Sequence, residues 1–393
     1  MTADTARLLV VDDNEDNRYT LLRRLGREGY ADVLTAATGR EALEIMRRER
    51  VDLALLDIMM PDMNGYQVLE HLKADTELRN LPVIMISAVE ELESVVRCIE
   101  LGAEDYLAKP FNATLLRARV GASLEKKRLR DAVRASLRRL EQELEAARDL
   151  QLSMLPPRFP QWTAERPVHL HAAMEPAREV GGDLYDMFWM DDGRLCFMVG
   201  DVSGKGAAAA MFMARMRSLV RMSVSLWQRF APRTATPSAV ARAVNGELFE
   251  ENTGRMFVTL FLGFLDPYNG RLAYANAGHP PPFMMPRREA LRRVVAQPEP
   301  PLGVRRDMAY SERTLDLAPG DALFIFSDGV TDAADVGEAL FGEARLEQVL
   351  EDSRDGSVED MVGAVRAAVD AFSGEAGRSD DVTMLALRWQ PRA

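Results

Sequence analysis

The stretch Glu175–Gly206, EPAREVGGDLYDMFWMDDGRLCFMVGDVSGKG, is the part of the chain around which the C-terminal half is organised. It contains two strand-like runs, Leu184–Met190 and Leu195–Val199, with the turn sequence Asp192-Gly193 between them. This pattern predicts a β-hairpin.

Each run of this hairpin has an acid next to a glycine at one end. Asp183 precedes the first run and Asp201 follows the second, so the hairpin brings both carboxylates to the same end. Two unpaired carboxylates about 4 Å apart repel by roughly 4 kcal/mol at an effective dielectric constant near 20, so such a pair needs a cation or a shared proton.

Asp328 in FIFSDGVTDA and Asp380 in RSDDVTMLALRW also lie at the ends of strand-like runs. Each acid alone is typical of a turn cap, but the four together favour a site for two Mg²⁺ or Mn²⁺ ions.

A family resemblance rests on five segments, EVGGDLYD, GDVSGKG, NAGHPPP, SDGVTDA and SDDVT. In this order they resemble the metal-dependent protein phosphatase family (PPM, type 2C), and most closely its bacterial branch, which acts on anti-sigma-factor antagonists in sporulation and stress responses. The resemblance covers about Leu150 to Trp389 and implies an α/β/β/α sandwich. The ligands that it implies are Asp183, Asp201, Asp328, Asp380 and the carbonyl group of Val202, with Asp201 bridging both metal ions.

The resemblance also implies an activity, the hydrolysis of phosphoserine or phosphothreonine by a water held between two Mn²⁺ or Mg²⁺ ions. The implied substrate is a phosphorylated anti-sigma-factor antagonist. The bacterial branch lacks the arginine with which its eukaryotic relatives bind the substrate phosphate. The resemblance therefore does not name the residue that binds the phosphate here. Arg178 and Lys205 are candidates, with solvated surface charges as the alternative. His279, in AGHPPP, is either a general acid or a hydrogen-bonded structural histidine.

Other patterns predict the remaining elements of this half. A helix is expected directly after Lys205-Gly206. Further helices are expected at Glu343–Glu351 and Val358–Phe372. The expected strands are His169–Met174, Phe257–Leu265, Arg271–Asn276, Met308–Leu315 and Ala322–Phe326.

The N-terminal part alternates apolar runs with stretches of helical periodicity. The runs are Arg7–Val11, Leu53–Leu56, Val83–Ile86 and Tyr106–Ala108. This alternation predicts an α/β fold with a doubly wound parallel five-stranded sheet, whose ligands bind at the carboxyl ends of the strands.

The polar residues at those ends are Asp12-Asp13, Asp57, Ser87 and Lys109-Pro110. Their arrangement resembles a two-component receiver domain over about Arg7 to Ala122. The resemblance implies that Asp57 accepts a phosphoryl group from a sensor histidine kinase. The Mg²⁺ ligands that it implies are Asp12, Asp13, Asp57 and the carbonyl group of Met59. The switch residues that it implies are Ser87, Tyr106 and Lys109; an ordinary half-buried aromatic is the alternative for Tyr106.

A long helix is expected between the two parts. Neither proline nor glycine interrupts Ala122–Leu155. The apolar seam of this segment, spaced as in a coiled coil, is formed by Val133, Leu137, Leu140, Leu144 and Ala147. We therefore expect a homodimer, with a helix packed on one of the domains as the alternative, because the next seam position is Gln151. The expected domains are a receiver at 1–122, a helical linker at 123–155 and a phosphatase domain at 156–393.

Composition limits the other possibilities. The chain has 393 residues and a formal net charge of −12, which argues against a nucleic-acid surface. Its two cysteines, Cys98 and Cys196, lie in apolar patterns and indicate a reducing cytoplasm. No apolar run is long enough to span a membrane, so no membrane association is expected.

Two other functions fit the same sequence. One is a non-catalytic adaptor that binds a regulatory protein when Asp57 is phosphorylated, and the other is a dimeric scaffold organised by the helix. In the favoured reading, phosphorylation of Asp57 changes the geometry of the helix or the dimer and so switches the phosphatase. The sequence does not give the direction of that switch.

Overall fold

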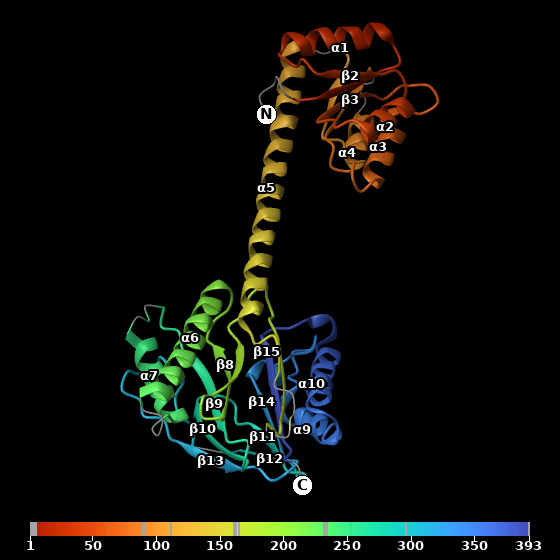
Figure 1. Ribbon diagram of the computed structural model, residues 1–393. Coiled ribbons are helices and arrows are strands. Elements are labelled where there is room, and N and C mark those ends of the chain that lie inside the picture. The colour runs from red at the N-terminus through yellow and green to blue at the C-terminus, as the bar shows by residue number, and fades with distance from the viewer. Residues whose placement is uncertain are drawn as a thin grey trace. The chain divides into compact units, whose positions relative to one another are not determined.

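The computed structural model describes residues 6–88, 92–110, 112–159, 163, 166–230, 235–250, 252, 254–294 and 297–391. The chain forms two compact units, Met1–Glu141 and Gln142–Ala393, whose elements are labelled in Figure 1. Within the described ranges, no helix is both long enough and apolar enough to cross a membrane.

The N-terminal unit contains a parallel five-stranded sheet with the strand order β2-β1-β3-β4-β5. The strands are β1 (Leu8–Val11), β2 (Val33–Ala36), β3 (Leu53–Asp57), β4 (Val83–Ser87) and β5 (Asp105–Ala108). The helices are α1 (Glu15–Arg27), α2 (Gly39–Arg48), α3 (Gly65–Ala74), α4 (Leu92–Glu100) and α5 (Ala113–Met154). The doubly wound parallel fold predicted for this part is confirmed.

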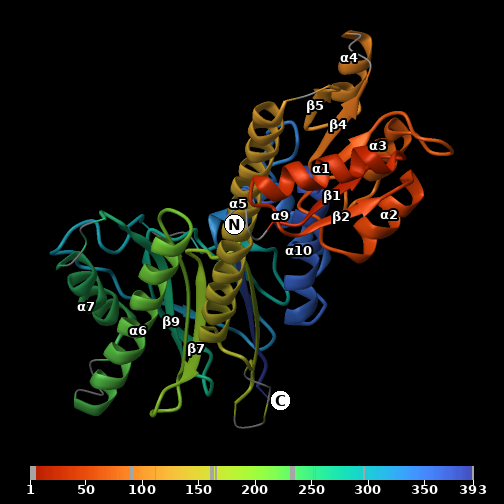
Figure 2. The same ribbon diagram turned by 90° about the horizontal axis from the view of Figure 1, so that it is seen from above.

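Both faces of this sheet are covered, because alternate strand residues point to opposite faces. Leu9 and Val11 of β1 belong to the core that contains buried residues of α2 and α3. Leu8 and Val10 belong to the second core, with buried residues of α1 and of the first turns of α5. Figure 2 shows α2 and α3 next to each other beside β1 and β2.

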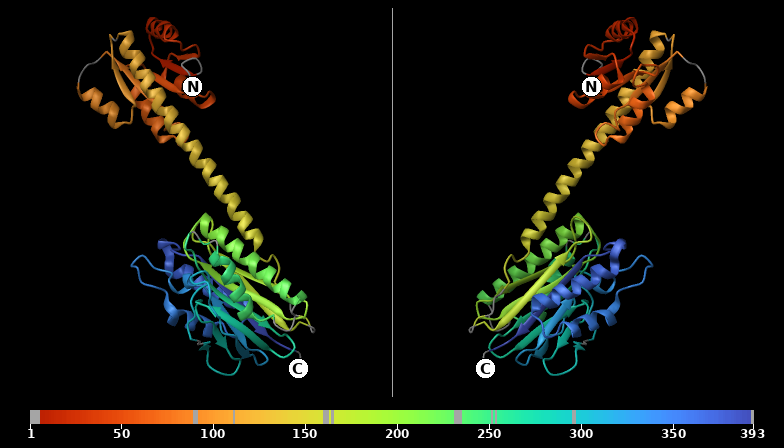
Figure 3. Two further views of the ribbon diagram at one scale, coloured as in Figure 1. Left: turned by 90° about the vertical axis from the view of Figure 1, so that its left-hand side faces the viewer. Right: turned by 90° about the vertical axis from the view of Figure 1, so that its right-hand side faces the viewer.

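Helix α5 is continuous over its 42 residues, as Figure 3 shows. Its beginning packs in the core of the N-terminal unit through Leu116 and Val120. Near its end, Leu152 and Leu155 pack against the core of the C-terminal unit. The predicted boundary between 122 and 123 therefore falls inside one helix, and the domain limits stay predictions.

The C-terminal unit is built from two antiparallel five-stranded sheets. The first has the order β13-β10-β9-β8-β7 and the second the order β12-β11-β14-β15-β6. The strands of the first are β7 (Leu184–Trp189), β8 (Leu195–Val202), β9 (Val258–Leu265), β10 (Arg271–Ala277) and β13 (Arg313–Asp316). Those of the second are β6 (Val168–Glu175), β11 (Phe283–Met285), β12 (Arg292–Arg293), β14 (Ala322–Phe326) and β15 (Val382–Trp389).

Helices cover the outer faces of the two sheets (Figures 1 and 3). The helices are α6 (Ala207–Phe230), α7 (Pro237–Glu250), α8 (Asp328–Thr331), α9 (Gly342–Asp352), α10 (Val358–Ser373) and the short 3₁₀ helix η3 (Gly374–Ala376). Leu323 and Ile325 of β14 belong to the core between the sheets, which extends to α6 and α7. Phe324 and Phe326 belong to the core beneath α9 and α10. The predicted α/β/β/α sandwich is confirmed.

One predicted strand is shorter than expected. The apolar pattern predicts a strand at Met308–Leu315, but β13 covers only Arg313–Asp316. These residues pair with Arg271–Tyr274 of β10, and the rest of β10 pairs only with β9. Tyr310, upstream of β13, is instead buried with its hydroxyl donating to the carbonyl oxygen of Pro301.

Candidate functional site

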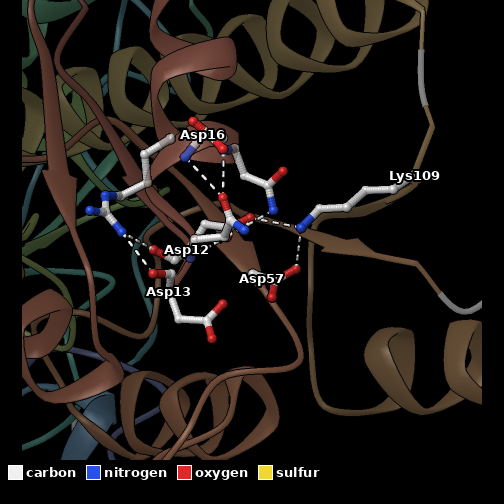
Figure 4. A network of polar contacts seen from close by, with 8 residues as sticks. Asp12, Asp13, Asp16, Asp57 and Lys109 are labelled. Atoms are coloured by element: carbon white, nitrogen blue, oxygen red, sulfur yellow. Dashed lines mark hydrogen bonds and ion pairs between the residues drawn. The ribbon is translucent and has the colours of Figure 1, made fainter.

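The carboxyl ends of β1 and β3 bring three acids together in the N-terminal unit (Figure 4). Carboxylate oxygens of Asp12, Asp13 and Asp57 lie within 4.8 Å of one another, and no other described group of three possible metal-binding side chains is this tight. Lys109, after β5, donates hydrogen bonds from Nζ to Asp12 Oδ2 at 2.7 Å and to Asp57 Oδ1 at 2.8 Å. Its ammonium group offsets part of the negative charge of the cluster.

Charge and burial act against each other at this cluster. Burial raises the pKa of Asp57, and the hydrogen bond from Lys109 only partly offsets this effect. Burial lowers the pKa of Lys109, but its hydrogen bonds to Asp12 and Asp57 outweigh burial and raise the pKa overall. Three carboxylates and one ammonium leave a negative site whose oxygen ligands suit Mg²⁺. These residues therefore fit the predicted ion.

The other residues predicted for this site lie close by in the fold. Ser87 is buried at the end of β4, and Tyr106 is half-buried in the neighbouring β5. The side chain of Met59 is 66% exposed, in the segment that follows β3. The roles of these three residues stay predictions.

The hairpin of the C-terminal unit forms as predicted. Leu184 of β7 is paired with Gly200 of β8, so Asp183 and Asp201 lie at the same end of the hairpin. Asp328 begins α8 after β14, and Asp380 lies two residues before β15. Four chain segments thus bring the four acids to one end of the sandwich.

Burial and neighbouring acids raise the pKa values of three of these aspartates. Burial raises the pKa of Asp183 well above its ordinary value, and Asp201 raises it further. Burial and then Asp328 raise the pKa of Asp201 to about 6. Asp328 is exposed at the surface but partly enclosed by its neighbours, and this partial desolvation raises its pKa, with Asp332 and Asp380 adding to the effect. Oxygens of these four acids are less tightly grouped than those around Asp57 among the described residues, and their mutual repulsion fits a divalent cation site.

Asp183 is the most enclosed of the four acids. Its side chain accepts a hydrogen bond from Ser327 Oγ at Oδ2, with a distance of 2.7 Å. Ser327 is fully buried and also accepts a hydrogen bond from the backbone N–H of Thr383. The orientation of Asp183 is therefore set by the ends of β14 and β15.

The Gly181-Gly182 pair in front of Asp183 allows a very close backbone approach. A Cβ atom at Gly182 would lie 2.6 Å from the carbonyl oxygen of Val202, the predicted backbone ligand. Asp381, the acid after Asp380, accepts the N–H of Gly182 at Oδ2 with a distance of 2.6 Å. This role of Asp381 is not predicted from the sequence, although the acid pair in RSDDVT is a signal for it.

The additional candidates differ in their surroundings. Lys205 Nζ forms an ion pair with Asp380 Oδ2 at 3.1 Å, so it is neither a purely solvated charge nor an open phosphate-binding group. Arg178 is exposed.

His279 is buried, its Nδ1 lies 2.9 Å from Thr259 Oγ1, and burial lowers its pKa to about 3. A histidine that is neutral near pH 7 is a poor proton donor, and this favours the structural reading of His279.

A buried ion-pair cluster behind the hairpin was also missed. Asp186 of β7 is fully buried and pairs through Oδ2 with Arg217 Nε at 3.0 Å and with Arg221 Nε at 2.5 Å. Both arginines come from α6, the helix that follows the Asp201 loop. The only sequence signal was an acid inside an otherwise apolar strand. The cluster ties α6 to the hairpin that carries Asp183 and Asp201.

Comparisons with known proteins cover both units. Residues 191–390, just over half of the chain, match the family described as Stage II sporulation protein E (SpoIIE). Residues 8–121 match the response regulator receiver domain.

Among curated proteins, the chain is 31% identical over 275 residues to protein IcfG of Synechocystis sp.. The alignment covers 62% of this chain and 41% of IcfG, so the chain spans about two fifths of that relative's length. The chain is also 40% identical over 120 residues to the probable transcriptional regulator ycf27 of Porphyridium aerugineum, covering 30% of this chain and 48% of that protein.

Among solved structures, the chain resembles the SiaA-PP2C domain of Pseudomonas aeruginosa. The TM-score is 0.56 at 22% identity, and the match covers 65% of this chain and 99% of that domain. At this identity the likeness shows a shared fold.

Proposed function

This chain belongs to the SpoIIE family and carries a response regulator receiver domain at residues 8–121, and from these facts we propose that it is a phosphorylation-controlled protein phosphatase. Its output is the metal-dependent hydrolysis of phosphoserine or phosphothreonine on a regulatory protein, an anti-sigma-factor antagonist. A sensor histidine kinase phosphorylates Asp57 in the cytoplasm and thereby controls this hydrolysis.

The observation that carries the proposal is the meeting of four aspartates from four separate chain segments at one end of the sandwich. Their desolvation and mutual repulsion raise the pKa of Asp183, Asp201 and Asp328. A folded protein keeps such a cluster at a cost in stability, and a function that needs cations there explains the cost. The adaptor and scaffold alternatives give no reason for it.

The residues of the site have distinct tasks. Asp183, Asp201, Asp328, Asp380 and the Val202 carbonyl would hold two Mn²⁺ or Mg²⁺ ions. When bound, such ions activate a water for in-line attack on phosphorus and stabilise the charge that develops on the phosphoryl oxygens. Ser327 orients Asp183, and Lys205 holds Asp380 and adds a positive charge near the point where an anionic phosphoprotein would enter.

The receiver has its own chemistry. Asp57 is the proposed phosphoacceptor, and its carboxylate is held in place by Lys109. Asp12, Asp13, Asp57 and the carbonyl group of Met59 would hold Mg²⁺, which together with Lys109 reduces the repulsion between the acids and an incoming phosphodonor. The resulting phosphoryl group would then contact Ser87 and Lys109, with Tyr106 as the switch.

A homodimer through α5 is supported by its exposed apolar seam. Val133, Leu137 and Leu140 are 59%, 55% and 58% exposed, and large aliphatic side chains at coiled-coil spacing are stabilised by burial against a second helix. Light scattering of the full chain should give twice the chain mass, and Leu137→Lys should give the single-chain mass. A single-chain mass for the wild type would refute the dimer.

The activity is tested by phosphate release from a phosphoserine peptide with and without Mn²⁺. We compare the wild type with Asp328→Asn and with the control Asp316→Asn, which changes an exposed acid on β13. Altering groups that only support metal ligands costs about 10–100-fold, so loss of a ligand should lower turnover by about 100-fold or more. Turnover that does not depend on Mn²⁺, or that survives in Asp328→Asn, would contradict the proposal.

A further inference from the structure

A cavity lined by arginines lies at one end of the second sheet of the C-terminal unit. Its volume is about 310 Å³, and its walls include Arg287, Arg354 and Arg388. Arg388 is near the end of β15, whereas Asp380 lies just before the strand begins at Val382. At about 3.3 Å per residue, the strand from Val382 to Arg388 is about 20 Å long. The cavity is therefore at the other end of the sheet from the four aspartates.

Arg388 is held in this cavity by carbonyl groups. It continues the row of β15 residues Met384 and Ala386, which belong to the core beneath α9 and α10. Its Nη1 donates to the carbonyl oxygen of Gly356 at 2.6 Å, and its Nη2 donates to that of Arg354 at 2.7 Å. Among the described residues, its buried Nε has no hydrogen-bond partner and no carboxylate forms an ion pair with its guanidinium group.

The positive charge of Arg388 is only partly compensated. Burial lowers the pKa of Arg388; the exposed Asp355 opposes this effect, and Arg287 adds to it. Carbonyl groups orient a guanidinium group but carry no full negative charge, and a charge taken out of water is stable only when it is paired. A cation in these surroundings favours the binding of an anion from solution.

The two other arginines of the cavity are also held in place. Arg354 Nη2 donates to the carbonyl oxygen of Pro286 at 2.8 Å, and its Nη1 pairs with Glu351 at 2.9 Å. The side chain of Arg287 lies across Gly320, where an added Cβ would be 2.7 Å from Arg287 Cδ. The glycine thus leaves the space that the arginine occupies. Side chains that are fixed before binding lose little conformational entropy when a ligand binds.

A second cavity adjoins the first. Its volume is about 210 Å³, and it shares Asp355, Arg388 and Gln390 with the larger cavity. It extends to the N-terminus of α10. The partial positive charge of a helix N-terminus also favours an anion. The larger cavity alone reaches the lower limit of small-molecule sites, about 300–1,000 Å³, so there is room for a small molecule.

We propose that these two cavities bind a small molecule through an oxyanion, a phosphate or a carboxylate group. Arg287 and Arg354 supply N–H donors, and Arg388 supplies the charge that the anion compensates. Guanidinium groups bind both kinds of oxyanion through paired N–H donors. The inference goes beyond the proposed phosphatase and does not depend on it, because neither the metal site nor the receiver takes part.

The test measures the urea midpoint of the full chain by tryptophan fluorescence, without divalent cations and at constant ionic strength. The probes are inorganic phosphate, glycerol 3-phosphate and citrate, which distinguish a free phosphate ion, a phosphate ester and a carboxylate. A ligand that binds only the folded chain raises the midpoint as its concentration increases. The variant is Arg287→Gln, and the control is Arg242→Gln, the same change at an exposed position of α7.

At least one probe should raise the midpoint of the wild type and of Arg242→Gln equally. Arg287→Gln should bind that probe about tenfold more weakly, the factor that corresponds to the loss of one hydrogen bond between charged groups. The probe that acts identifies the group that is bound. No shift with any probe, or equal shifts in the wild type and in Arg287→Gln, would overturn the inference.

Arg388→Met tests the buried charge separately. Methionine keeps much of the apolar stem of the side chain but carries no charge. This variant should show no shift of the midpoint with any probe, and a shift as large as that of the wild type would contradict the role given to Arg388. If Arg388→Met does not fold, the comparison of Arg287→Gln with Arg242→Gln decides.

Discussion

Replacing Gly182 by alanine tests how closely the backbone segments of the metal site must approach one another. The added Cβ would lie 2.6 Å from the carbonyl oxygen of Val202, whereas a comfortable C···O contact is about 3.3 Å, so the overlap is about 0.7 Å. Val202 ends β8, which is hydrogen-bonded to β7 and β9 on its two sides and cannot easily shift. Overpacking of this kind costs about 1–3 kcal/mol, and we expect the upper part of that range.

The matched control is Gly246→Ala in α7, where an added Cβ meets no atom within 4 Å. Glycine inside a helix is less favourable than alanine by roughly 0.5–1 kcal/mol, so this control should be more stable than the wild type. Urea unfolding followed by tryptophan fluorescence is suited to the comparison. The chain has four tryptophans, of which Trp189, Trp227 and Trp389 lie in the described part of the C-terminal unit and none precedes residue 142 in the sequence.

A free energy of unfolding for Gly182→Ala within about 0.5 kcal/mol of the wild type would refute the steric argument, since only surface changes normally have so small an effect. The variant should also bind Mn²⁺ more weakly, because the Cβ displaces the Val202 carbonyl. Unchanged Mn²⁺ affinity in a destabilised variant would refute the assignment of that carbonyl as a ligand.

Two further predictions concern buried groups outside the metal site. Asp186→Asn should lower the free energy of unfolding by about 2–4 kcal/mol, because it leaves Arg217 and Arg221 without their buried carboxylate, whereas the exposed control Asp191→Asn should change it by less than about 0.5 kcal/mol. Equal urea midpoints for the two variants would be inconsistent with this role. Burial lowers the pKa of His279 to about 3, so its stabilising contribution is complete above about pH 6.5 and is lost as the pH falls. Between pH 6.5 and 4.5 the wild type should lose about 2.3 kcal/mol more than His279→Gln. Equal losses in urea titrations at the two pH values would show that His279 is not buried as a neutral group.

Turn residues and the alternation of apolar residues in the sequence predicted the hairpin and the strands of the receiver. The Asp192-Gly193 turn and the strand-like runs on either side of it predicted the hairpin. In the structure, the pairing of Leu184 with Gly200 places Asp183 and Asp201 at the same end of it. The apolar runs that stop at polar residues likewise predicted the strand ends of the receiver.

The parts that the sequence did not predict depend on tertiary contacts. Helix α7 was missed because Asn245 and Gly246 weaken its local helical pattern. In the fold, Asn245 is buried and binds the backbone of Gly303, Arg305 and Arg306. These contacts, together with a hydrogen bond from the Tyr310 hydroxyl, explain why an amide is buried in a helix.

The supporting residues of the site were hidden for the same reason. In the sequence, Gln151 occupies the position where the apolar coiled-coil seam ends, and Asp381 is only the acid that follows Asp380. Each acts on the backbone of a segment far away in the sequence, Gly181 and Gly182, and no spacing rule connects them. The acids predicted to be ligands carried a recognisable pattern because each follows or precedes a strand.

Phosphorylation of Asp57 is proposed to control hydrolysis at the four aspartates of the phosphatase domain in the same chain. The most direct test measures Mn²⁺-dependent phosphate release from a phosphoserine peptide by the wild type and by Asp57→Asn, each with and without Mg²⁺ and beryllofluoride, a mimic of phosphorylated Asp57. Coupling between two sites is typically 1–3 kcal/mol, so we predict a change of about fivefold or more for the wild type and none for Asp57→Asn. Turnover of the wild type that is the same with and without beryllofluoride would contradict the account.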